Sequence, residues 1–171
     1  EDGLNTSNLN LPNLTIVKQY KNLSHRHRNF LKNYFHLYGA RRKGLPDGNR
    51  ELVLIQLERY FYIYESLVSH GIKNFVNLDS DCVILEDLST HNFEKIGIVY
   101  APFSEDCVAS PLMSSTTNLD KFLDFTCSFY EGVQQQEDKI AYINSFFNKP
   151  RKQVTDMTLW HLFKEENPNL F

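Results

Sequence analysis

Hydrophobic residues recur along this chain at helical and strand spacings, and these two patterns predict its elements. The clearest is a stripe of aliphatic and aromatic residues over 53–68 that repeats every three or four positions and is followed by Gly71. This spacing predicts a long amphipathic helix that ends at the glycine. Four further helices are expected: over 24–39 with Ser24 as N-cap, from a capping box at Thr117 and Asp120, over 138–147, and from Thr155.

Three short apolar runs predict strands at 14–20, 73–78 and 96–103. Placed among the helices, they produce the order β-α-α-β-β-α-α-α. Alternation of helices with short buried strands favours the α/β class, with a mixed, mainly parallel sheet flanked by helices in a Rossmann-like arrangement. Ligands in such sheets bind beyond the carboxyl ends of the strands. The residues that follow 73–78 are therefore the first place to look for a site.

Polar and glycine-rich stretches set the expected domain organisation. Residues 1–12 are rich in Asn and predict a flexible N-terminal segment, and 39–50, with three glycines and four basic residues, predicts an exposed loop. A length of 171 residues fits one domain, which we expect over 13–171. Because the chain begins with Glu1, we expect a processed or excised piece of a longer protein.

Composition narrows the classes of protein. Hydrophobic residues make up 42% and aromatic residues 13% of the chain, which is typical of an ordered globular protein. A formal net charge of -3 gives no reason to expect nucleic acid as a partner, and no apolar run is long enough to predict a transmembrane segment. Three cysteines without CxxC spacing argue against disulfides or zinc, so a reducing, cytoplasmic location is expected.

Two acids, Asp79 and Asp81, directly follow the predicted strand at 73–78 and are separated by Ser80. Acids two apart in extended backbone point the same way, and two neighbouring carboxylates repel unless a positive charge lies between them. A hard cation such as Mg²⁺ or Mn²⁺ suits this arrangement. An exposed turn, a metal site for a phosphate-bearing substrate, and a nucleophile with its acid partner all remain open.

The segment LERYFYIYESLVSHGIKNFVNLDSDCVIL, residues 57–85, resembles the helix, strand and DxD motif of GT-A-type glycosyltransferases. The later stretches NLDKFLDFTCSFYEG and VTDMTLWHLF resemble segments that follow DxD in some bacterial sugar transferases. The resemblance extends over about residues 14–165, although only the segment around DSD is specific. It implies a GT-A-like fold and transfer of a sugar from a UDP- or GDP-linked donor to a glycan or another hydroxyl acceptor.

The resemblance also implies roles for individual residues. Asp79 and Asp81 would bind Mn²⁺ or Mg²⁺ against the donor diphosphate, with Ser80 in the same site, and the cation would neutralise charge on the departing nucleotide. Arg59 is a candidate for contacting a phosphate, and a surface ion pair with Glu58 or Glu65 is its alternative. Asp156 is the candidate general base for the acceptor hydroxyl, and a helix N-cap is its alternative role.

Two other functions remain open. DSDCV also resembles the first motif of the haloacid dehalogenase family of phosphatases, in which Asp79 would be the nucleophile, Asp81 the general acid/base and Ser104 a phosphate-binding hydroxyl. A non-catalytic GT-A-like domain that only binds a glycan or a partner is the third hypothesis.

Overall fold

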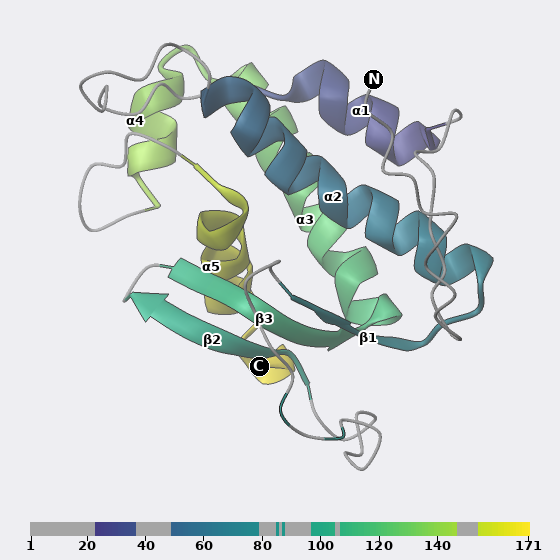
Figure 1. Ribbon diagram of the computed structural model, residues 1–171. Helices are drawn as coiled ribbons and strands as arrows, with labels where there is room; N and C mark the ends of the chain where they lie inside the picture. The colour runs from purple at the N-terminus through teal and green to yellow at the C-terminus, as the bar shows by residue number, and fades with distance from the viewer. Residues whose placement is uncertain are drawn as a thin grey trace.

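Helices make up most of the part of the chain that the structure describes. The structure is a computed structural model, and it describes residues 23–36, 49–78, 85, 87, 97–104, 107–146 and 154–171. The elements in chain order are α1 (His25–Asn33), α2 (Asn49–Ser69), β1 (Asn74–Asn77), β2 (Val99–Ser104), β3 (Cys107–Ser115), α3 (Thr116–Gln135), α4 (Lys139–Asn144), α5 (Asp156–Glu166) and the 3₁₀ turn η3 (Pro168–Leu170). Figure 1 shows α1, α2 and α3 running beside one another above the sheet, with α5 against the sheet.

The prediction of a mixed, mainly parallel sheet flanked by helices, in a GT-A-like and Rossmann-like arrangement, is wrong. The described strands form a single three-stranded sheet in the order β1-β3-β2, and both pairings are antiparallel. The hairpin follows from the short connection, because only two residues separate Ser104 from Cys107 and a parallel pairing needs a crossover of a dozen or more. The expected strand at 14–20 lies outside the described residues.

The central strand, β3, was not predicted at all. Its sequence, CVASPLMSS, carries Pro111, which normally argues against a central strand because proline donates no hydrogen bond to the ladder. The structure accommodates the proline at an irregularity: Tyr100 pairs with Leu112, but Ala101 pairs with Ala109. Residues 110 and 111 therefore have no opposite partners on β2, as at a bulge.

The apolar faces of the two long helices largely match the hydrophobic pattern, but both helices begin at residues other than the predicted ones. On α3, all five residues expected on the apolar face are buried: Leu119, Phe122, Leu123, Thr126 and Phe129. The helix is capped by Ser115, whose hydroxyl accepts from the Asn118 N–H, and not by the predicted Thr117 capping box.

α2 begins at Asn49, inside the loop predicted over 39–50, and ends before Gly71, whose φ of +66° suits glycine. Val68, expected on the buried stripe, is exposed.

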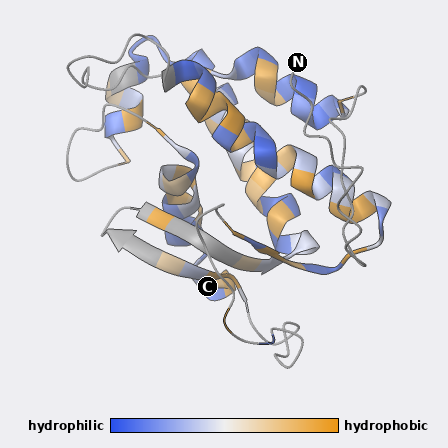
Figure 2. Cartoon of the chain, in the orientation of Figure 1, coloured by the Kyte–Doolittle hydropathy of each residue, from blue (hydrophilic) through white to orange (hydrophobic). Residues whose placement is uncertain are grey.

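The first helix, α1, is shorter than predicted and mostly hydrophilic (Figure 2). Ser24 caps it as expected, and it ends at Asn33, whereas Gly39 was the predicted end. Its buried side chains are His27 and Phe30. The His27 ring stacks on Phe61 of α2, and its Nε2 lies 3.1 Å from the Glu58 carboxylate. A polar helix therefore docks through one aromatic side chain and one buried, partnered histidine.

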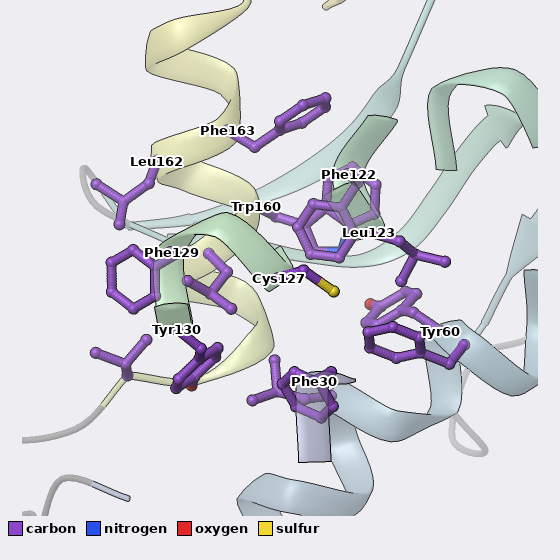
Figure 3. Close-up of a cluster of buried hydrophobic side chains, with 14 of the residues drawn as sticks. Phe30, Tyr60, Phe122, Leu123, Cys127, Phe129, Tyr130, Trp160, Leu162 and Phe163 are labelled. Atoms are coloured by element: carbon purple, nitrogen blue, oxygen red, sulfur yellow. The ribbon is translucent and has the colours of Figure 1, made fainter. Parts of the chain in front are cut away.

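An aromatic cluster joins α2, α3 and α5 (Figure 3). Trp160 of α5 stacks on Phe122 of α3 with ring centroids 3.6 Å apart and planes 5° from parallel. Tyr60 of α2 meets both rings edge-on, at 5.5 Å from Phe122 and 5.7 Å from Trp160. Since all three side chains are 3% exposed or less, this cluster fixes how α5 sits against the helices.

Among the described helices, none combines the length and apolar character that a bilayer crossing requires.

We expect Leu57→Ala to lower the free energy of unfolding by about 2–5 kcal/mol, because Leu57 is 1% exposed in the core. Leu52, on the same helix and 53% exposed, is the matched control, and Leu52→Ala should change it by less than about 0.5 kcal/mol. Urea unfolding followed by circular dichroism measures both. Equal effects would mean that another face of α2 is buried.

We also expect His27→Ala to destabilise the protein by about 1–3 kcal/mol, since it leaves a cavity and removes a partner of Glu58. His25 is exposed at the start of the same helix, and His25→Ala should stay within about 0.5 kcal/mol. The same unfolding measurement applies. If both substitutions have the same small effect, the docking of α1 through His27 is refuted.

Candidate functional site

Two residues that were predicted separately as site residues lie in direct contact. Arg59, in the middle of α2, places a guanidinium nitrogen 2.7 Å from the Asp156 carboxylate at the start of α5, 97 positions later in the chain. The Asp156 side chain is 4% exposed and the Arg59 side chain 32%. The pair therefore joins a buried carboxylate to an arginine whose side chain is partly exposed.

The start of α5 explains why Asp156 points into the protein. Thr155 is the N-cap, and it forms a reciprocal capping box with Thr158, whose hydroxyl accepts from the Thr155 N–H. Asp156 is thus the first helical residue, and its predicted alternative role as the N-cap is wrong. A carboxylate in the first turn also interacts favourably with the helix dipole. The cap leaves the Asp156 side chain available for Arg59.

Burial dominates the ionisation of Asp156. Loss of hydration raises the pKa of this carboxyl above the ordinary value of 3.8, although the Arg59 charge, the Met157 backbone N–H and hydrogen bonds from Arg59 and Tyr60 oppose the shift. A carboxyl whose pKa rises beside an arginine is one that water reaches poorly. Asp156 therefore holds a proton more readily than a surface aspartate does.

Tyr60 completes the cluster, although its place in the hydrophobic stripe over 53–68 predicted a core position. Its hydroxyl donates to Asp156 at 3.4 Å and accepts from Arg59 at 3.2 Å, while the Arg59 guanidinium also lies 5.0 Å from the centre of the Tyr60 ring. Burial raises the pKa of Tyr60, so the hydroxyl keeps its proton. Only the adjacency of Arg59 and Tyr60 in LERYF hinted at this role, because spacing alone cannot show which distant acid meets them.

The alternative ion pairs predicted for Arg59 do not form among the described contacts. Glu58 lies against the His27 ring at 3.1 Å, and Glu65 accepts from the Ser24 backbone N–H at 3.2 Å. Both glutamates thus face α1, whereas Arg59 faces α5. The buried histidine between these acids was not predicted as a structural partner, since the HxH pattern at 25–27 carries no sign of burial.

The predicted metal site lies outside the described residues. β1 ends at Asn77 as expected from the apolar run at 73–78, but Asp79, Ser80 and Asp81 follow in the part of the chain that is not described. Within the described ranges, no group of three His, Cys, Asp or Glu side chains is placed to hold a metal ion. What the described part contributes is an arginine held by a buried acid, which suits the binding of an anion.

We expect Asp156→Asn to gain stability relative to the wild type as the pH rises. Because the folded pKa of Asp156 lies above the unfolded value of 3.8, the folded chain binds more protons between these two values. Stability from this carboxyl is present below the unfolded pKa and is lost as the pH passes through the folded pKa. Urea unfolding from pH 3 to 7 measures the difference, at most about 1.4 kcal/mol per pH unit.

Asp120→Asn is the control with the opposite sign. Burial alone raises the pKa of Asp120, but the hydrogen bonds from Tyr64 and Arg26 and the Arg26 charge outweigh it and lower the pKa. Stability from Asp120 is therefore present above pH 3.8 and lost as the pH falls through its folded pKa. The same slope for both variants would contradict the environment described for Asp156.

Comparison with known proteins adds no assignment to this site. No family model, no curated protein and no solved structure matches the chain. The chemistry of the site therefore follows from its own side chains.

Proposed function

We propose that the chain is a metal-dependent glycosyltransferase that moves a sugar from a nucleotide diphosphate donor to a hydroxyl acceptor. The observation that carries the proposal is the geometry of Arg59. The Arg59 side chain is partly exposed, and its guanidinium is bound by the buried Asp156 carboxylate. A cation fixed in this way is suited to a phosphate, because little side-chain freedom is lost when the anion binds.

The position of Arg59 in the chain supports the same proposal. The helix that carries it, α2, leads through the Gly71 turn directly into β1, and β1 leads into Asp79 and Asp81. The two acids bind Mn²⁺ or Mg²⁺, which when bound stabilises negative charge on the departing nucleotide. Arg59 contacts the same diphosphate. One continuous segment thus supplies both the metal ligands and the basic group.

Asp156 receives a different role from the general base expected on the basis of sequence. A base must approach the acceptor hydroxyl to within hydrogen-bonding distance, and a side chain that is 4% exposed and bound to Arg59 offers little access. Its contacts support a positioning role instead. Asp156 holds the guanidinium, and Tyr60 hydrogen-bonds to both.

We expect UDP or GDP with Mn²⁺ to raise the melting temperature of the purified chain by about 5–10 °C at about 100 times Kd. Asp79→Ala and Asp81→Ala should abolish the metal-dependent part of the shift. Arg59→Gln should weaken nucleotide binding about tenfold, which corresponds to about 1.4 kcal/mol. Thermal-shift titration with and without Mn²⁺ measures all three effects.

Arg50→Gln is the matched control, because Arg50 lies exposed on the first turn of the same helix and should leave binding unchanged. Stabilisation by beryllium fluoride without any nucleotide effect would contradict the proposal and favour the phosphatase. No response to either ligand would contradict both enzymes and favour a binding domain.

A further inference from the structure

The helix α1 lies against a face of α2 and α3 that is rich in carboxylates. It runs along the side of the helices that is turned away from the sheet (Figure 1). We call this surface the acidic docking face, and define it by the acids that contact α1 or its N-cap residue. They are Glu58 and Glu65 of α2 and Asp120, Asp124 and Glu131 of α3.

On the α3 side of this face, α1 supplies fewer cations than there are acids. The Arg26 guanidinium lies 2.7 Å from the Asp120 carboxylate and 2.9 Å from the Asp124 carboxylate, so one cation serves two anions. Glu131 accepts a hydrogen bond from the side-chain amide of Asn29, which is neutral. One positive charge thus faces three negative charges.

On the α2 side, the only ring between the two glutamates is that of His27. Its Nε2 lies 3.1 Å from Glu58 and its Nδ1 lies 4.0 Å from Glu65, and the imidazole is charged only when it is protonated. Glu65 also accepts from the Ser24 backbone N–H, which is neutral. Among the described contacts, the acids of the docking face therefore outnumber the cations that α1 presents to it.

The hold of α1 on this face rests on few contacts. The helix has nine residues, and helices this short are marginal without tertiary support. Its buried side chains are His27 and Phe30, and the Phe30 ring stacks on Phe61 of α2 with centroids 4.8 Å apart. A short element with one buried apolar anchor opens at a lower free energy than the helices of the core.

We propose that the acidic docking face is an interaction surface for a basic helix of a partner protein, and that α1 occupies it as an intramolecular competitor. The chemistry of the partner follows from the charge that α1 leaves unmatched. The same charge argues against nucleic acid and anionic membranes as occupants, because both are polyanions. This interaction is separate from sugar transfer and does not depend on it.

The contacts of α1 specify what the partner helix presents. Residues 26, 29 and 30 lie at i, i+3 and i+4, on one side of a helix, which is how amphipathic helices are read by a docking surface. An aromatic residue at the position of Phe30 fills the site beside Phe61. Cations at the positions of both Arg26 and Asn29 bind the α3 acids more completely than α1 does.

Fluorescence anisotropy with the whole chain and two labelled peptides tests the proposal. One peptide has the sequence of residues 23–36, LSHRHRNFLKNYFH, and the other carries Asn29→Arg. We expect the Asn29→Arg peptide to bind about two- to fivefold more tightly, because it gains an ion pair with Glu131. Arg26→Gln in the chain should tighten the binding of both peptides, since it weakens the competing α1.

Hydrogen exchange locates the bound peptide. If the peptide displaces α1, the amides of residues 25–33 should lose protection as the peptide is added. Glu131→Gln in the chain should remove the advantage of the Asn29→Arg peptide, because the carboxylate that this arginine meets is gone.

Lys32→Gln is the matched control for Arg26→Gln, because Lys32 is an exposed cation of the same helix and should leave peptide affinity unchanged. Circular dichroism confirms that each variant is folded. The proposal is overturned if neither peptide binds to the folded Arg26→Gln chain or if both peptides bind equally well. It is also overturned if the preference survives Glu131→Gln, or if binding leaves the protection of α1 unchanged.

Discussion

The stacking of Trp160 on Phe122 is the contact on which the arrangement of the site depends. It joins α5 to α3 through two almost parallel rings that are fully buried, with Tyr60 of α2 packed edge-on against both. Trp160 lies four residues after Asp156, about one helical turn, so the stack determines where the Asp156 carboxyl lies. Together with the packing of α5 against β3, it places Asp156 beside Arg59.

The long helix α2 contributes polar side chains to three junctions with its neighbours. Glu58 and Glu65 face the buried His27 region of α1, and Arg59 reaches Asp156 of α5. Tyr64 of α2 packs against the guanidinium of Arg26 of α1, and Arg26 forms ion pairs with Asp120 and Asp124 of α3. Glu58, Glu65 and Arg59 thus each meet a polar partner at these interfaces, as a buried charge requires.

These three junctions differ in how much water reaches their acidic side chains. The acids that pair with Arg26 are 43% and 68% exposed, so water and salt screen them and they contribute little to stability. Asp156 is shielded, so burial and the neighbouring Arg59 charge both shift its pKa. The ionisation of such a buried group responds more strongly to a nearby charge than that of the exposed acids of α3 does.

Local patterns predicted the helices better than the sheet. The apolar stripes of α2 and α3 face the core largely as their spacing requires, because helical periodicity depends on neighbours a few residues away. The central strand escaped prediction because Pro111 suggests a loop, and only pairing with β2 shows that the proline sits at an irregularity. The parallel sheet was expected from the alternation of elements, and strand pairing contradicts it, since pairing is decided by distant residues.

The sequence by itself determined that α2 carries Arg59 beside Tyr60, that a polar cap starts α5 near Thr155, and that two acids follow β1. These features depend on hydrophobic spacing and on capping chemistry, which act within a few residues. Tertiary structure alone decided that Asp156 meets Arg59, 97 positions away, and that the acid is buried while the arginine is partly exposed. That outcome depends on how α5 packs against α3 and β3, and no local pattern encodes it.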